Sequence, residues 1–301
     1  MTALPLSCFI IAKNEADRIA RTIRSVRPWV DEVVVVDSES TDDTVRVAAS
    51  EGCRVVTQAW LGFGQQKRFA EDQCRNSWVL NLDADEVVTP ALRDEIIALF
   101  AGDGPAEVGY CMPLELVYPG ADQPRLWARD HRYVRLYDKR AVRFRDSCVH
   151  DTVVTGNFPI GSLQAPAYHY SFRSYDDLKQ KLAERMALYA KHARCSSQTK
   201  LLARLVVERP MNLFKYYVVR RHFTGGLKGL KYSWIQASFR HEKVAHMWRA
   251  RNSGVASTAS PAPHPQPHGT AERQGGAAAI GSEFGLFPKA PPTGEIYAER
   301  A

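Results

Sequence analysis

The stretch WVLNLDADE, at residues 78–86, decides the fold. Its first five residues are mostly apolar, as in a buried strand, and three acidic residues follow within the next four positions. Ligands of open α/β sheets bind at the carboxyl ends of the strands. Because side chains two residues apart on a strand point the same way, Asp83 and Asp85 are predicted to face one point. A divalent cation between two such carboxylates removes their repulsion and can hold a diphosphate.

The same acidic residues also fit a simple turn before a helix. Thr89 and Pro90 are a typical N-cap and first-turn proline, and they predict a helix that reaches about Phe100. Asp and Glu favour both the turn and the helix N-terminus, so they need no ligand there. The spacing leaves both interpretations open, and the position at a sheet edge favours the metal site.

Strands and helices alternate ahead of this stretch. Strands are predicted at residues 6–12, 32–36 and 53–57, and helices at 16–27, 42–51 (with Thr41 as N-cap) and 65–75. The second strand is apolar on both faces, which indicates a sheet covered on both sides. This alternation predicts an α/β fold with a doubly wound, mostly parallel sheet.

The pattern changes beyond residue 105. Strands are predicted at 108–118, 132–137 and 152–154, a helix at 174–195, and further helices over 200–250 with interruptions at Pro210 and at Gly225-Gly226. From Asn252 onward, Ala, Pro, Gly and Ser make up 28 of 50 residues, a composition that predicts disorder.

Charge is distributed unevenly along the 301 residues. Residues 200–251 have twelve Lys/Arg and two Asp/Glu, whereas residues 1–199 have a net charge of −2 and residues 252–301 of −1. One segment is therefore expected to meet an anionic partner. No 18-residue apolar window and no cationic leader are evident, so neither a spanning helix nor a secretory signal is expected. Six scattered cysteines fit a reducing cytoplasm.

Two more polar segments follow predicted strands. Asp37 ends the second strand, where it could accept hydrogen bonds from a base or a ribose hydroxyl, while the Ser, Thr and Asp residues after it fit a turn. Lys13-Asn14-Glu15 follows the first strand, although any loop there is polar. Neither G-x-G-x-x-G nor G-x-x-x-x-G-K-[ST] follows the first strand, which argues against a dinucleotide oxidoreductase and a P-loop NTPase.

Four stretches in order, IIAKNEADRI, VVVVDSESTDDT, GFGQQKRFAED and WVLNLDADEVVTP, resemble family-2 glycosyltransferases of the GT-A fold. GFGQQK, Arg135-Leu136-Tyr137 and Val149-His150-Asp151 are more similar to the lipopolysaccharide core glucosyltransferase branch. The resemblance runs from about Leu6 to about Trp248. It implies a GT-A nucleotide-sugar-binding and catalytic domain at 1–170. Charge and composition add a helical, basic, membrane-proximal region at 171–251 and a disordered tail at 252–301, which lies outside the resemblance.

The resemblance implies an inverting transfer of a hexose, such as glucose, from a nucleotide-diphosphate sugar, usually a UDP-sugar, to a hydroxyl of a lipopolysaccharide core or other lipid-linked glycan. A divalent cation, Mg²⁺ or Mn²⁺, would assist the leaving diphosphate. By resemblance, the nucleoside is contacted by Asn14, Glu15 and Asp37, the metal by Asp83 and Asp85, and the diphosphate by Lys67. Asp83 would contact the donor as well, and Asp85 is the firmer metal ligand. Lys67 also fits a solvated helix lysine.

Inversion by direct displacement needs a general base on the acceptor hydroxyl. Asp151 is our candidate, at a position where the branch pattern has Glu, so its reach is shorter by about one methylene. His150 is the next candidate, as base or as a metal or phosphate contact, and Asp130 is the third. His150-Asp151 could instead be a loop pair with structural hydrogen bonds only.

The basic segment mixes its Lys and Arg with Leu, Phe, Tyr and Trp at helical spacing, which fits a helix in a membrane interface. We therefore expect a cytoplasmic enzyme, peripheral at the inner face of the cytoplasmic membrane. The segment could also be a helical layer packed on the catalytic domain. No nucleic-acid partner is expected, because no helix-turn-helix, RRM or zinc-finger pattern is present. The oligomeric state is left open.

Two other classes of function share single features with this sequence. A haloacid-dehalogenase-like phosphatase also has D-x-D at a strand end, but on the first strand of its domain, whereas three predicted strands precede Asp83. A non-catalytic membrane- or polyanion-binding module on a degenerate nucleotide fold would lack donor binding, and thermal shifts with UDP and a divalent cation would distinguish it.

Overall fold

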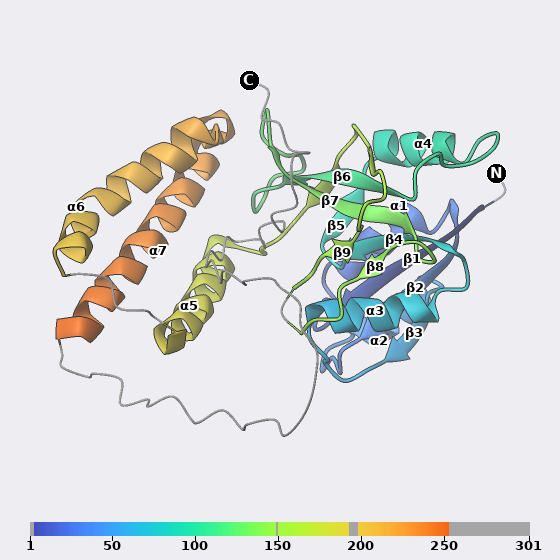
Figure 1. Ribbon diagram of the computed structural model, residues 1–301, viewed down its shortest axis with the longest axis horizontal. Helices are drawn as coiled ribbons and strands as arrows, with labels where there is room; N and C mark the ends of the chain where they lie inside the picture. The colour runs from blue at the N-terminus through green and yellow to red at the C-terminus, as the bar shows by residue number, and fades with distance from the viewer. Residues whose placement is uncertain (1–2, 149, 193–197, 253–301) are drawn as a thin grey trace, which may run out of the picture.

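A computed structural model describes residues 3–148, 150–192 and 198–252 of the chain (Figure 1). The predicted disordered tail lies outside the described residues from 253 onward.

A mixed nine-stranded sheet in the order β3-β2-β1-β4-β7-β6-β11-β5, with β10 beside β6, organises the described residues before 170. Its strands are β1 (Leu4–Ala12), β2 (Val30–Asp37), β3 (Arg54–Thr57), β4 (Trp78–Asp83), β5 (Glu86–Val88), β6 (Gly109–Leu116), β7 (Arg129–Asp138), β10 (Gly161–Ser162) and β11 (Ala167–His169). Strands β1 to β4 are parallel, and β7 runs antiparallel to both β4 and β6. The predicted mostly parallel α/β sheet is confirmed.

Helices cover both faces of this sheet, as predicted (Figure 1). They are α1 (Ile19–Val26), α2 (Thr44–Ser50), α3 (Phe63–Gln73) and α4 (Pro90–Leu99). Val33 and Val35 of β2 lie in one hydrophobic cluster with residues of α1 and α4, whereas Val34 and Val36 lie in a second cluster with Ala70 of α3. The alternation of side chains along one buried strand therefore supplies both cores.

Local signals placed some helix ends correctly and others not. Thr89 caps α4, because its hydroxyl accepts a hydrogen bond from the Leu92 amide at 3.2 Å. The prediction that Thr41 caps the next helix was wrong: α2 begins at Thr44, and the Thr41 amide instead donates to Asn14. The predicted interruption at Pro210 was also wrong, since Pro210 lies inside a continuous helix.

The chain continues from the sheet into helices. These are α5 (Tyr175–His192), α6 (Gln198–Phe214), a π-helical turn η1 (Lys215–Val219), a 3₁₀ turn η2 (His222–Gly225) and α7 (Gly226–Asn252). The break expected at Gly225-Gly226 is confirmed, because α7 begins there and Gly226 has a φ of +58°. Figure 1 shows α6 and α7 side by side, with α5 between them and the sheet. A third core joins α5 and α7 to the end of β6 through Leu116, Leu178 and Tyr232.

Within the described ranges, no helix has the length and apolar character needed to cross a membrane.

Candidate active site

The carboxyl ends of β1, β2 and β4 meet at one edge of the sheet. Ala12 pairs with Asp37 across β1 and β2, and Ile11 pairs with Asp83 across β1 and β4. This register brings the loop after β1, with Asn14, beside the two strand-end aspartates. The structure thus brings together the three polar strand ends identified in the sequence.

Asn14 and Asp37 shape the β2 side of this edge. The Asn14 side-chain oxygen accepts from the Thr41 amide at 2.8 Å, and the Asn14 amide donates to the Ser40 hydroxyl at 2.9 Å, so Asn14 ties two loops together. Asp37 is buried, and its Oδ2 accepts from the Ser40 amide at 2.9 Å. Its Oδ1 is also buried and has no hydrogen-bond partner among the residues described. One carboxylate oxygen at this edge therefore accepts no hydrogen bond from the described residues.

Glu15 is held by two arginines. Its Oε1 accepts from Arg18 Nη2 at 2.7 Å, and its Oε2 lies 3.0 Å from Arg173 Nη2. The Glu15 carboxylate therefore joins α1 to the segment just before α5. Its predicted contact with a nucleoside stays a prediction.

Lys67 of α3 lies between two predicted site carboxylates, the metal and donor ligand Asp83 and the candidate base Asp151. Its Nζ is 2.8 Å from Asp83 Oδ1 and 2.9 Å from Asp151 Oδ2. The side chain is fully buried, so the alternative of a solvated helix lysine was wrong. A buried ammonium requires such partners, because an unpaired charge in the interior is strongly destabilising.

Arg135 of β7 completes the pairing of Asp83. Its Nη2 lies 2.9 Å from Asp83 Oδ2 and 2.6 Å from Glu86 Oε1, and it also donates to Asn81. Burial acts to raise the pKa of Asp83, but the charges of Arg135 and Lys67 outweigh it and hold that pKa well below its ordinary value. Burial raises the pKa of Glu86 to about 7, opposed by Arg135 and reinforced by Asp83.

Asp85 faces a different set of partners. Its Oδ1 lies 3.5 Å from His169 Nε2, and its Oδ2 lies 3.3 Å from Arg18 Nη1. Burial opposes ionisation, yet the pKa of Asp85 is lowered by His169 and Arg18, and the pKa of His169 is raised by Asp85 despite burial. The two aspartates share the edge, but the neighbours of each carboxylate differ.

The GFGQQK motif holds the loop that leads to Asp151. A Cβ on Gly64 would collide with the Arg145 carbonyl oxygen and lie 2.6 Å from that of His150, so only glycine permits this close approach. The amides of Gly64 and Gln65 donate to the Ser147 carbonyl at 3.1 and 3.3 Å. The loop therefore supplies acceptors to the free amides at the N-terminus of α3.

The three candidate bases differ in position. Asp151 is beside Lys67, and its buried Oδ1 has no hydrogen-bond partner within the described ranges. His150 is exposed, and its backbone amide donates to the Ser147 hydroxyl at 3.1 Å. Asp130 lies in β7, and its side chain is outside what the structure describes.

Sequence reasoning missed His169 and Arg18. It also assigned no role to Arg135. His169 ends the three-residue strand β11, which is too short to show a period, and it reaches Asp85 because it pairs with Glu86 across β11 and β5. Arg18 precedes α1 and resembles any exposed helix arginine in sequence. Arg18 and Arg135 each stand in a quoted stretch, whereas His169 stands in none.

Comparisons with known proteins agree with this architecture. The sequence model of the family described as glycosyl transferase family 2 matches residues 7–153. An uncharacterized glycosyltransferase of Rickettsia felis is 39% identical over 251 residues, which are 80% of this chain and 89% of that protein. A lipopolysaccharide core biosynthesis glycosyltransferase, LpsC, of Rhizobium meliloti is 34% identical over 180 residues, covering 53% of this chain and 62% of that one.

A solved structure of glucosyl-3-phosphoglycerate synthase from Mycobacterium tuberculosis, in complex with Mn²⁺, UDP and glucosyl-3-phosphoglycerate, is 28% identical. It covers 38% of this chain and 44% of that chain with a TM-score of 0.29, too low for its ligands to bear on this site. The Rickettsia protein is 39% identical over 89% of its length, and the family model matches the sheet domain. Together with the sheet edge described above, these similarities show that this chain is a glycosyltransferase and belongs to glycosyl transferase family 2.

Proposed function

We propose that this glycosyltransferase transfers a hexose, such as glucose, from a UDP-sugar to a hydroxyl of a lipopolysaccharide core or other lipid-linked glycan, with inversion and with a divalent cation. The observation that carries the proposal is the convergence of Asp83, Asp85, Lys67 and Asp151 at the sheet edge where α/β folds bind ligands. The acceptor class is supported by the resemblance of the sequence to the lipopolysaccharide core branch and by the similarity to LpsC.

The residues at the edge fit Mg²⁺ or Mn²⁺. Neighbouring ligands of one octahedral ion, each about 2.1 Å from it, are about 3.0 Å apart. Asp85 Oδ1 and His169 Nε2 are 3.5 Å apart and would need to move slightly closer to hold it together. Among the residues described, no group of three or more His, Cys, Asp or Glu is arranged to hold a metal, so diphosphate oxygens and waters would supply the remaining ligands. Asp85 and His169 would hold the ion, and the ion would stabilise the leaving UDP as a Lewis acid.

Asp83 has a different part in the proposal. Both of its oxygens are paired with cations, Lys67 and Arg135, so it is already neutralised without a metal. We keep it as a predicted ligand of the metal and donor and assign it a second task, the positioning of Lys67. Held between Asp83 and Asp151, the Lys67 ammonium lies at the edge where a diphosphate would bring negative charge.

Asp151 is the proposed general base. Its Oδ2 is fixed by Lys67 at 2.9 Å, whereas its Oδ1 accepts no hydrogen bond from any described residue and could take the proton of an acceptor hydroxyl. The exposed His150 has no comparable side-chain anchor in the hydrogen bonds and ion pairs described above. Asp151 is therefore favoured over His150.

The enzyme is proposed to work at the inner face of the cytoplasmic membrane, since a lipid-linked acceptor is presented there to a cytoplasmic enzyme. The phosphatase alternative is not supported, because β1, β2 and β3 precede the Asp83 strand and the chain belongs to a glycosyltransferase family.

Two measurements on the purified protein test the proposal. UDP with Mn²⁺ should raise the unfolding temperature, and one UDP-sugar in a panel should be hydrolysed slowly without acceptor. The Asp85→Asn variant should lose both effects, while Asp43→Asn, a matched change of an exposed aspartate paired only with Arg46 on the surface, should keep them. Stabilisation by UDP that is equal with and without metal, or unchanged in Asp85→Asn, would contradict the proposed metal site.

A further inference from the structure

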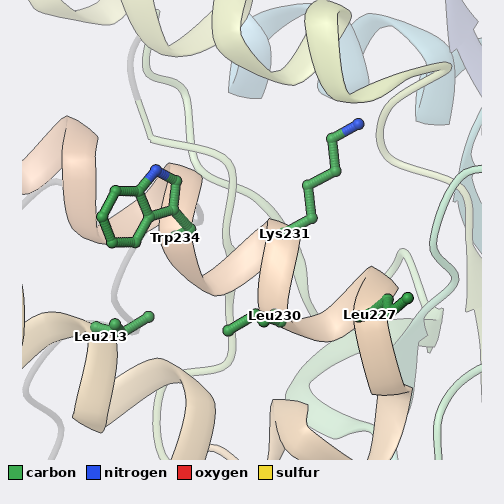
Figure 2. Close-up of a pocket in the computed structure, with 5 residues that line it drawn as sticks. All are labelled: Leu213, Leu227, Leu230, Lys231 and Trp234. Atoms are coloured by element: carbon green, nitrogen blue, oxygen red, sulfur yellow. The ribbon is translucent and has the colours of Figure 1, made fainter.

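The hairpin of α6 and α7 has an apolar outer surface. A groove of about 470 Å³ is lined by Leu213 of α6 and by Leu227, Leu230, Lys231 and Trp234 of α7 (Figure 2). Leu227, Leu230 and Trp234 follow a helical i, i+3, i+7 spacing, so they form one stripe. Leu227 is 84% exposed and Trp234 is 49% exposed. Large apolar side chains at this exposure in one contiguous stripe are typical of an interaction surface.

Further exposed apolar side chains lie on α6 and on the turn after it. Val206 is 73% exposed, and Met211, Phe214 and Val219 are also more than half exposed. We call the exposed apolar residues of α6, η1, η2 and α7 the hairpin face. None of the three described hydrophobic cores includes these residues, so their exposure is not needed to build the fold.

Positive charge surrounds the hairpin face. Residues 200–251 include twelve Lys or Arg and two acidic residues. Glu208 is buried and paired with Arg204, which leaves Glu242 as the exposed acid within the described part of this segment. Exposed Lys215, Lys228 and Lys231 lie on the same turns as the apolar residues. The face thus combines apolar side chains with cations and has almost no compensating negative charge.

Arg209 adds a cation at the groove itself. Its guanidinium carbon lies 5.6 Å from the centre of the Trp234 ring, and its buried Nε has no hydrogen-bond partner among the residues described. An arginine beside an exposed tryptophan fits an interface where the ring enters the acyl boundary and the guanidinium meets a headgroup phosphate.

We propose that the hairpin face docks on an anionic lipid bilayer, with Leu227, Leu230 and Trp234 entering the interface. This inference rests on the proposed function, in which the acceptor is lipid-linked, and it names the surface that brings the enzyme to that acceptor. A second copy of the chain is the weaker occupant, because pairing two such faces would bring two strongly basic segments together. An anionic leaflet complements both the cations and the apolar stripe.

A loop links this face to the candidate active site. Trp127, in the loop before β7, is 58% exposed and lies against Arg221, whose guanidinium carbon is 5.4 Å from the ring centre. Arg125 Nη2 in the same loop donates to the Arg220 carbonyl at 3.0 Å. The loop leads into β7, which holds Arg135 against Asp83. Docking of the hairpin would therefore fix the catalytic edge relative to the membrane.

The test is co-sedimentation of the full chain with vesicles of phosphatidylcholine alone or with about one third phosphatidylglycerol. The wild-type chain should bind the anionic vesicles and should be released by high salt. The Leu227→Glu/Trp234→Glu variant should lose vesicle affinity by about tenfold or more, because it removes two apolar anchors and adds two negative charges. Val45→Glu, at a 38% exposed valine on α2, is the control and should bind like the wild type.

The outcomes separate this inference from the proposed function. Unaltered unfolding temperatures and unaltered UDP–Mn²⁺ binding in the double variant would show that it is folded. Vesicle binding that is absent in the wild type, or equal in the double variant, would overturn the docking surface even if UDP binding is intact. A wild-type dimer that the double variant converts to a monomer, without vesicle binding, would overturn it in favour of a second copy. Vesicle binding without any UDP binding would leave the docking surface supported and refute the proposed donor.

Discussion

Replacing Lys67 by Met should destabilise the fold measurably, because the change removes a fully buried ammonium from between two carboxylates. Removing one partner of a buried ion pair costs about 3–5 kcal/mol. Asp83 keeps Arg135, and the side chains of Asp83 and Asp151 are 33% and 22% exposed, so the lower end, about 3 kcal/mol, is expected. For a domain of this size that is a fall in unfolding temperature of about 6–12 °C.

The lowered pKa of Asp83 determines how the loss of stability in Lys67→Met changes with pH. Lys67 and Arg135 lower the pKa of Asp83, so the stabilisation is present above the carboxylate's unfolded pKa and is lost as the pH falls through the lower folded value. The difference in stability between wild type and Lys67→Met should thus be nearly the same at pH 7 and pH 4 and should shrink toward about pH 2. Circular dichroism melts at these pH values measure it.

Lys13→Met is the matched control, because Lys13 is exposed at the same sheet edge and is not among the ion pairs of the described residues. This substitution should lower the free energy of unfolding by less than about 0.5 kcal/mol. An equal loss of stability at about pH 2 and at pH 7, or no loss at pH 7, would refute the idea that ionised carboxylates hold Lys67.

Three further predictions concern the reaction. Asp151→Asn should lower turnover by a factor of about 10²–10⁴ while UDP affinity, measured by calorimetry, stays within about twofold; near-normal turnover would remove Asp151 from the role of base. Treatment with EDTA should abolish UDP-sugar hydrolysis, and added Mn²⁺ should restore it in the wild type but not in Asp85→Asn. Gly64→Ala should destabilise the chain by about 1–3 kcal/mol in urea melts and should also lower turnover, because the new methyl would push the Asp151 loop away from α3. An unchanged unfolding free energy together with unchanged turnover would show that the loop tolerates the displacement.

The first half of the fold could be predicted because its signals are local. The apolar runs of β1, β2 and β4 and the Thr89-Pro90 helix start each lie within one short window of sequence. The order of the sheet could not be predicted beyond β4, because β7 enters between β4 and β6 through pairing with β4 residues 56 to 60 positions away. Strands of two or three residues, such as β10 and β11, show no period at all.

The same distinction applies to the candidate site. Asp37 and Asp83 were predicted at one edge because parallel strands end together, and the register confirms this placement. Arg135 and His169 reach that edge from strands far along the chain, so no spacing could pair them with Asp83 or Asp85. For Lys67 the sequence allowed two interpretations, and only its burial decides between them.

The glycines of the GFGQQK motif and the pairing of Lys67 with Asp151 have one physical explanation. A short aspartate side chain can reach the Lys67 ammonium only if its loop lies close to α3. Gly62, with a φ of +106°, and Gly64 let the backbone of Arg145, Ser147, Cys148 and His150 lie directly against the start of α3. Lys67 follows Gly64 by one helical turn, and Asp151 is thereby brought to 2.9 Å from its ammonium. The motif and the loop therefore form one structural unit, in which the close packing permitted by glycine places Asp151 beside Lys67.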